Sequence, residues 1–229
     1  MSHRDKFLNR IRTNLADALL PAAEPQHPGS FQAYSFNTNQ SIEALVERFE
    51  QELTALSGQV YRVEEAEGIA EIVLSILEKH DARQIMSWGS AALEPYRLSE
   101  ALQAGGIEVV ERYIPAEREG HAAQLAALDN VRVGLTGANG ALADTGAIAL
   151  ISGPDRGRLA SLLPPVHIAI LSRQTIYPSL PAFLAEQTKI IAMGSNLVFI
   201  AGPSRTGDIE MTLTMGVHGP GEVHVIITP

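Results

Sequence analysis

The segment QVYRVEEAEGIAEIVLSILEKHDARQIMSWGS (residues 59–90) decides the fold class of this chain. It opens with QVYRV, a short β-branched and aromatic run typical of a strand, and closes with a second such run, RQIMSW. Between these runs, apolar residues recur at helical spacing, namely Ile69, Ile72, Val73, Ile76 and Leu77. Lys79 and His80 end the predicted helix with basic groups, which suit the negative end of its dipole. The segment therefore predicts a strand, a helix and a second strand in succession.

The alternation continues on both sides of this segment. Apolar spacing and turn residues predict a helix over residues 41–58, a helix over 91–104, a strand over 107–111, a helix over 117–129 and a strand over 131–137. Ser41 is the expected N-cap of the first of these helices, and Gly58 is its expected C-terminal stop. This rhythm predicts an α/β fold, with a mainly parallel sheet that is flanked by helices.

The second half of the chain has a different pattern. Short, apolar, β-branched strands are predicted for GAIALIS (146–152), VHIAILS (166–172), NLVFIAG (196–202) and EVHVIIT (222–228). One helix is predicted among them, around PSLPAFLAEQTK (178–189). We expect the sheet to continue through this half with some antiparallel or hairpin pairing.

The N-terminal residues form a separate segment. RDKFLNRIRTNLADALL (4–20) places apolar residues on one face of a helix, with basic residues between them. PAAEPQHPGS (21–30) then breaks the helix with three prolines and a glycine. The predicted organisation is an N-terminal helix and proline-rich linker over residues 1–30, followed by an α/β domain over residues 31–229.

Composition limits the classes of function. The formal net charge of −9 argues against a general nucleic-acid binder or a binder of anionic membranes. The chain has no cysteine, so it contains no disulfide, thiol nucleophile or cysteine-ligated iron–sulfur cluster. The N-terminus is too polar for a secretory signal, and no apolar run approaches the roughly 20 residues of a membrane span. These features predict a cytoplasmic protein without membrane insertion.

Three glycine-bearing loops follow predicted strands: WGSAALEP (88–95), TGANGALADTG (136–146) and AGPSRTGDIE (201–210). In an open parallel sheet, ligands bind at the carboxyl ends of the strands, so these loops are expected to meet at one edge. None carries a dinucleotide fingerprint or a P-loop. The histidines are scattered without a metal-ligand spacing, so no metal site is predicted.

The loop that contains Arg205 is the first candidate for an anion site. The guanidinium fork of Arg205 matches a carboxylate or phosphate. Ser204, Thr206 and the backbone N–H groups are expected to supply further donors, and Gly202 allows close backbone approach. Asp208 is expected in the first turn of a helix, whose positive end also favours an anion. The structural alternative is that Ser204 or Thr206 caps a helix that begins near Asp208, with Arg205 paired to an acid.

Groups that handle protons are found in the same loops. His218 and Asp144 are candidates for a general base, and Glu210 is a further candidate carboxylate. Each has a structural alternative, because His218 and Asp144 also suit ordinary turns, with Thr145 beside Asp144. Gly89 and Ser90 are candidates for anion binding at a helix N-terminus, although Ser90 also suits an N-cap.

The stretches TGANGALADTGAIALIS (136–152), LLPPVHIAIL (162–171) and AGPSRTGDIEMTLTMGVHGPGEVHVIIT (201–228), in this order and spacing, resemble the lactate-utilisation protein C family, also called the LUD-domain family. The similarity is strongest over residues 131–229 and extends more weakly to SWGSAALE. The positions that match the family motifs are Ala143, Asp144, Thr145, Gly146, Gly202, Pro203, Ser204, Arg205, Thr206, Asp208, Glu210, Gly216, His218, Gly219 and Pro220.

The resemblance implies a fold like that of the glucosamine-phosphate isomerase, ribose-phosphate isomerase and CoA-transferase superfamily. It also implies a role in oxidising L-lactate to pyruvate, as one subunit beside iron–sulfur partner proteins. Because the chain has no cluster ligands, the electrons would pass to those partners. On this hypothesis Arg205 holds the carboxylate of a small anionic ligand, and His218 or Asp144 assists proton removal from the hydroxyl group.

Two other classes of function remain open from the sequence. The first is a stand-alone enzyme of the superfamily that acts on a sugar phosphate or a CoA thioester, with Asp144 or Glu210 as its carboxylate. The second is a non-catalytic assembly subunit, in which the loops are structural and the N-terminal helix docks a partner. The fold alone does not decide among these classes.

Overall fold

The computed structural model describes residues 3–17, 40–89, 96–110, 117–206, 214–216 and 218–229. The chain divides into two compact units, Met1–Phe36 and Asn37–Pro229. The described part of the first unit is helix α1 (His3–Asp17), where the sequence predicts a helix. The predicted boundary at residues 30–31 lies outside the described residues. No helix in the described residues has both the length and the apolar character that a membrane span requires.

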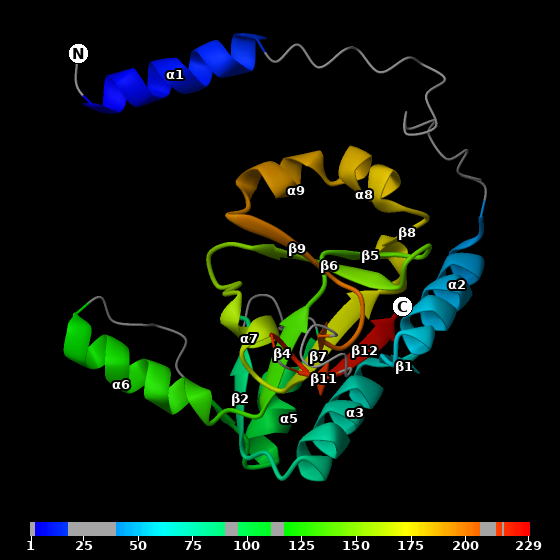
Figure 1. Ribbon diagram of the computed structural model, residues 1–229. Coiled ribbons are helices and arrows are strands. Elements are labelled where there is room, and N and C mark those ends of the chain that lie inside the picture. The colour runs from blue at the N-terminus through cyan, green and yellow to red at the C-terminus, as the bar shows by residue number, and fades with distance from the viewer. Residues whose placement is uncertain (1–2, 18–39, 90–95, 111–116, 207–213, 217) are drawn as a thin grey trace. The chain divides into compact units, whose positions relative to one another are not determined.

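Six parallel strands form the central sheet of the second unit, in the order β1-β12-β7-β4-β2-β3 (Figure 1). Their bounds are β1 (Gln59–Arg62), β2 (Gln84–Ser87), β3 (Glu108–Val109), β4 (Val133–Gly137), β7 (Val166–Ser172) and β12 (Glu222–Thr228). The strands β7 and β12 are buried along almost their whole length because both faces of this sheet are covered. The predicted α/β fold with a mainly parallel sheet is confirmed.

Successive apolar residues of the central strands point to opposite faces of the sheet, and helices cover both faces. These helices are α2 (Ile42–Ala55), α3 (Ala66–Lys79), α5 (Leu98–Ala104) and α7 (Leu159–Leu162), whereas α6 (Arg118–Asp129) buries only Leu128 and extends away from the sheet. On one face, α3 and α5 pack on apolar residues of β2, β4, β7 and β12. On the other face, α2 packs on β7 and β12. Ser41 caps α2 as predicted, because its Oγ accepts a hydrogen bond from Ala44 N at 3.2 Å.

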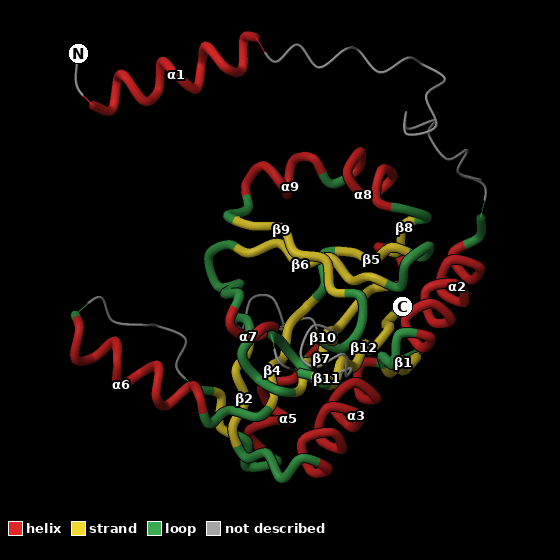
Figure 2. Tube along the Cα trace, in the orientation of Figure 1, coloured by secondary structure: helices red, strands yellow, loops and turns green. Residues whose placement is uncertain are grey.

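A second sheet of four strands has the order β8-β5-β6-β9 (Figure 2). Its strands are β5 (Gly140–Leu142), β6 (Ala147–Ser152), β8 (Ile176–Tyr177) and β9 (Asn196–Ile200). The antiparallel pairs are β5–β6 and β6–β9. Three helical segments accompany this sheet: the 3-10 turn η2 (Arg173–Thr175), α8 (Leu180–Glu186) and α9 (Thr188–Met193).

This second sheet corrects the prediction that one sheet continues through the second half. Only Ala138 and Asn139 separate β4 from β5. A crossover to a parallel neighbour needs about a dozen residues, so β5 must leave the central sheet and pair in a hairpin with β6. The predicted strands over 166–172 and 222–228 do join the central sheet, whereas those over 146–152 and 196–202 do not.

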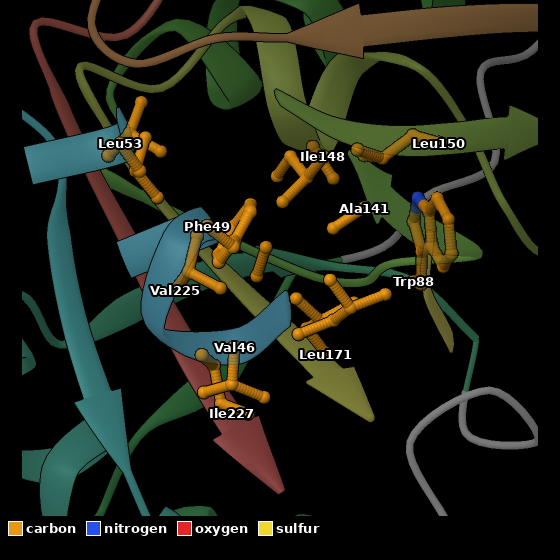
Figure 3. Close-up of a cluster of buried hydrophobic side chains, with 14 of the residues drawn as sticks. Val46, Phe49, Leu53, Trp88, Ala141, Ile148, Leu150, Leu171, Val225 and Ile227 are labelled. Carbon is orange, nitrogen blue, oxygen red and sulfur yellow. The ribbon is translucent and has the colours of Figure 1, made fainter. Parts of the chain in front are cut away.

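Helix α2 lies between the two sheets. Its residues Val46, Phe49 and Leu53 point into a cluster of buried apolar side chains (Figure 3). The partners in this cluster include Val225 of β12 and Ile148 of β6. Phe49 and Leu53 are fully buried. Each such side chain stabilises the fold by about 1.5–3 kcal/mol, so the position of α2 is fixed by both sheets.

Candidate functional site

The loop after β9 leads to the amino edge of the central sheet, through the short strands β10 (Arg205–Thr206) and β11 (Thr214–Met215). Ser204 N donates to Pro220 O at 2.8 Å, and Gly216 N donates to Ser204 O at 2.9 Å. Gly221 N then donates to Pro165 O at 2.9 Å, just before β7 begins. These bonds hold the loop beside the first residues of β7 and β12.

The loops therefore do not meet at one edge of the parallel sheet. Gly89 follows the carboxyl end of β2, where its N–H donates to Asp155 O at 2.7 Å. Ser204 lies at the opposite, amino edge. The expectation of a single carboxyl-edge site is wrong, because β9 belongs to the second sheet and its loop returns to the start of β12.

Arg205 contacts the C-terminal end of α2. Its Nη2 donates hydrogen bonds to the carbonyl oxygen of Leu56, the C-cap residue, and to Ser57 Oγ at 2.8 Å. The last carbonyls of a helix lack intrahelical donors and carry partial negative charge, so a guanidinium stabilises them. Gly202 packs on the same turn, where a Cβ would lie 3.0 Å from Leu56 O. Arg205 is exposed, and its Nε and Nη1 take no part in these two bonds.

The hairpin turn between β5 and β6 contacts the preceding turn of α2. Gly146 has a φ of 64°, and a Cβ there would lie 2.4 Å from Leu53 N. Asp144 is exposed as a residue, but partial burial of its carboxyl group raises its pKa above the usual value. Glu52 raises this pKa further, whereas the hydrogen bond from Thr145 and the charge of Arg48 lower it.

Both motif loops thus pack along one face of α2. Arg48, Glu52 and Leu56 are spaced four residues apart, so they lie on one stripe of the helix. Asp144 interacts with Arg48 and Glu52, while Arg205 binds Leu56. Arg48 Nη2 and Glu52 Oε1 form an ion pair at 2.8 Å. The arrangement places two cations and two anions along this stripe.

The structure describes only some of the remaining predicted residues. His218 is exposed, and its backbone N–H lies 3.4 Å from Ser204 Oγ, to which it donates. Gly219 also approaches Ser204, since a Cβ at this position would lie 3.6 Å from the serine Cβ. Ser90, Asp208 and Glu210 lie outside the described residues. The backbone of Thr206 is described as part of β10, but the placement of its side chain is not.

The family model described as "LUD domain" matches residues 46–228. This chain belongs to the LUD domain family. The LUD protein is 29% identical to "Lactate utilization protein C" of Halalkalibacterium halodurans, over 96% of this chain and 95% of that protein. It is 32% identical to "Lactate utilization protein C" of a Geobacillus species (strain WCH70), over 69% of this chain and 68% of that protein.

A solved structure shares the fold of this LUD protein. The crystal structure of a DUF162 family protein from Deinococcus radiodurans aligns with a TM-score of 0.62. The two chains are 22% identical, and the alignment covers 83% of this chain and 99% of that chain.

Two histidines of this LUD protein were not singled out from the sequence. His167 lies within the matched stretch 162–171, is fully buried in β7, and has its Nε2 2.9 Å from Thr136 Oγ1. His224 is buried in β12 and, with His80 and Glu222, forms a group whose ligand atoms lie within 4.8 Å of one another. The spacing of Glu222 and His224 in the sequence could have indicated part of this group, because residues two apart on a strand share a face.

Two hollows lie on the amino side of the central sheet. The first has a volume of about 260 Å³ and is lined by residues that include Leu74, Glu78 and Gly105. The second, of about 390 Å³, is lined by residues that include Gln84, Glu108 and Arg132. Both are also bounded by residues 81–83, which follow α3. Neither lining includes a residue that the sequence predicts for the anion site.

Proposed function

We propose that this chain functions in lactate utilisation, as a subunit that binds a small hydroxycarboxylate and relies on iron–sulfur partner proteins for electron transfer. The proposal is supported by the similarity to proteins named "Lactate utilization protein C", which extends over nearly the full length of one of them. Three of the family motif residues, Gly146, Gly202 and Arg205, contact α2 or its C-terminal turn, so this helix is the surface to which we assign the ligand.

The observation that carries the proposal is that Asp144 interacts with Arg48 and Glu52 of α2, while Arg205 binds Leu56, one turn further along the same face. One turn of an α-helix rises about 5.4 Å, a spacing comparable with the length of a small hydroxy acid. In the proposed complex, the N–H groups of Arg205 that α2 does not use hold the carboxylate. The Asp144 carboxylate accepts the hydroxyl proton, a role for which a raised pKa is suited.

The reaction needs an electron acceptor outside this chain. Oxidation of lactate to pyruvate removes two protons and two electrons, and the hydroxyl C–O bond becomes a carbonyl. Asp144 takes the hydroxyl proton, the two electrons leave C2 for an acceptor on the partner proteins, and the second proton passes to solvent. Since the chain has no cysteine, it has no thiolate ligands for a cluster, and in this proposal iron–sulfur clusters held by the partner proteins would accept the electrons.

A second candidate function is non-catalytic assembly, and the bonds of Arg205 favour it. Its guanidinium group satisfies the end of α2, which gives this motif residue a structural role without any ligand. Gly146 and Gly202 likewise have packing roles against α2. In this function the surface formed by α2 and the loops supports the complex, and the substrate is bound by a partner.

The first experiment isolates the protein from its native host grown on L-lactate and quantifies the iron that co-purifies. Stoichiometric iron-bearing partners are expected, and a protein that elutes alone and iron-free would overturn the subunit proposal. Lactate oxidation by the isolated assembly is then measured for Arg205→Lys, with Arg158→Lys as the matched control at an exposed loop position.

The two candidate functions predict different results for Arg205→Lys. A lysine keeps the positive charge at the end of α2 but loses the planar fork that binds a carboxylate. Substrate binding by Arg205 predicts a KM for lactate at least tenfold higher, with the assembly intact. An unchanged KM for this variant would favour the assembly function.

A further inference from the structure

His80, Glu222 and His224 form a cluster at the amino edge of the central sheet. His80 ends α3, whereas Glu222 and His224 share one face of β12. Glu222 Oε2 lies 3.3 Å from His80 Nε2 and 3.4 Å from His224 Nε2. Both Nε2 atoms are buried, and neither has a hydrogen-bond partner among the described residues. Two buried ring nitrogens therefore face one carboxylate oxygen of Glu222, whose side chain is 38% exposed.

The hydrogen bonds of Tyr61 determine which nitrogen of His224 carries its proton. Tyr61 Oη donates to Gln59 Oε1 at 3.2 Å. Its oxygen is then the acceptor for His224 Nδ1, which also lies at 3.2 Å. With the proton on Nδ1, the Nε2 atom of His224 presents its lone pair to Glu222. An outer hydrogen bond of this kind typically orients a histidine that ligates a metal.

A lone pair that faces a carboxylate oxygen is repulsive unless a cation lies between the two atoms. Such a lone pair is presented by His224 Nε2, and His80 Nε2 faces the same oxygen without a hydrogen-bond partner among the described residues. The ligand atoms of the three residues lie within 4.8 Å of one another, an arrangement that suits a bound cation.

We propose that His80, Glu222 and His224 bind a divalent transition-metal ion, with zinc as the best match. Zinc bonds to histidine nitrogen and carboxylate oxygen are about 2.0–2.2 Å long, which sets the edges of a tetrahedron near 3.3–3.6 Å. The two nitrogen-to-oxygen distances of 3.3 and 3.4 Å match such edges. Two histidines and one carboxylate are an established donor set for zinc, and they leave a fourth position for water or a ligand.

Lys79 is the competitor for this site. Its Nζ lies 3.1 Å from Glu222 Oε2, the same oxygen that the metal would take. The lysine side chain is 56% exposed, so it can turn into solvent when a metal binds. Removing its charge should therefore strengthen metal binding, whereas removing a ligand should weaken it. This opposite response distinguishes a metal site from a network of ion pairs.

The test uses the full-length, untagged chain after treatment with a chelator. Zn²⁺ is titrated in competition with a fluorescent zinc indicator, and Co²⁺ is added in parallel to record its visible absorption. The wild type is expected to bind one equivalent of Zn²⁺ and to give the strong absorption of four-coordinate Co²⁺. His80→Ala and Glu222→Gln should each weaken Zn²⁺ binding by more than 100-fold, because outer-shell changes alone cost about 10- to 100-fold.

Three further variants make the test specific. Tyr61→Phe removes the hydrogen bond to His224 and should weaken binding by about tenfold. Lys79→Gln should bind Zn²⁺ more tightly than the wild type. His3→Ala, in α1, should bind as the wild type does. Circular dichroism of the metal-free variants separates lost folding from lost binding. His80 and Glu222 are chosen for substitution because their side chains are more exposed than that of His224.

Two results would overturn the proposal. One is the absence of saturable Zn²⁺ binding by the folded wild type. The other is binding that His80→Ala and Glu222→Gln leave unchanged, which would place the metal elsewhere on the chain. The site is independent of the proposed role in lactate utilisation, because none of these measurements depends on lactate oxidation.

Discussion

The guanidinium group of Arg205 donates a hydrogen bond to the carbonyl oxygen of Leu56, the residue that ends α2. The two residues are 149 positions apart in the sequence, so this bond joins the C-terminal motif to the helix that lies between the sheets. A second bond, to Ser57 Oγ, fixes the same nitrogen. The loop that contains Arg205 is thus held by the end of a core helix, which links its position to the stability of the fold.

Replacing Arg205 should lower stability to an extent that depends on charge. Arg205→Ala is expected to reduce the free energy of unfolding by about 1–2 kcal/mol, because a charged hydrogen bond and a favourable helix-dipole interaction are lost. Arg205→Lys should lose less than half of this, because the ammonium group keeps the charge near Leu56. Urea unfolding at neutral pH measures both values. Equal stability of the alanine variant and the wild type would show that the bond contributes nothing.

Gly146→Ala should be strongly destabilising, because two separate costs apply at this position. A positive φ of 64° disfavours alanine by about 1 kcal/mol, and the new Cβ would lie 2.4 Å from Leu53 N. We expect a total loss of more than about 3 kcal/mol, since the turn or α2 must shift. Thermal and urea unfolding measure this loss.

Two glycines provide matched controls for that variant. Gly106→Ala also has a positive φ, 67°, but its Cβ meets nothing within 4 Å, so it should show only the backbone cost of about 1 kcal/mol. Gly157→Ala has neither constraint and should change stability by less than about 0.5 kcal/mol. If Gly146→Ala behaves like Gly106→Ala, the packing of the β5–β6 turn on α2 is not tight.

The α/β class and most elements could be predicted from the sequence because they depend on local periodicity. The spacing of Ile69, Val73 and Ile76 reflects one buried face of α3, and these residues are buried in the structure. The division into two sheets is not local. It depends on the two-residue connection between β4 and β5, and β5 has only three residues, too few for an alternating pattern.

The candidate residues could be chosen from the sequence, but their arrangement in space could not. Glycine, arginine and aspartate in loops are visible in a sequence, and the motif loops do both pack on α2. Their common partner is the stretch 52–57, the last turn of α2 and the residues that follow it, and nothing in the sequence of this stretch indicates that the two loops pack there. His80 and Glu222 are 142 residues apart, so only the folded chain brings them within 3.3 Å.

Asp144→Asn tests the proposed role of this carboxylate in proton removal. Loss of a general base typically costs about 10²–10⁴ in rate, so kcat for lactate oxidation by the assembly should fall by at least 100-fold. KM should change little, because the carboxylate of the substrate is assigned to Arg205. Steady-state kinetics of the purified assembly measure both constants. Full activity of Asp144→Asn in an intact assembly would contradict the proposed role.

His167 should make the stability of the fold depend on pH. It is fully buried, and burial lowers its pKa from 6.5 to about 3, with a smaller contribution from His224. Between about pH 3 and pH 6.5, His167 therefore binds a proton in the unfolded chain but not in the folded chain. Stability is complete above pH 6.5 and falls as the pH decreases from 6.5 toward 3, by about 2 kcal/mol between pH 7 and pH 5.

The variant His167→Gln removes this titration and keeps a polar side chain beside Thr136 Oγ1, the partner of the histidine Nε2. Its stability at pH 7 should be lower than that of the wild type, because the shape of the buried ring is lost. The difference between the two proteins should then shrink by about 2 kcal/mol on going to pH 5, because only the wild type loses the contribution of a neutral His167. Urea unfolding at several pH values measures this difference, with a chelator present so that metal binding at His224 does not contribute. Curves that stay parallel from pH 7 to pH 5 would mean that His167 is protonated in the folded protein as easily as in the unfolded chain.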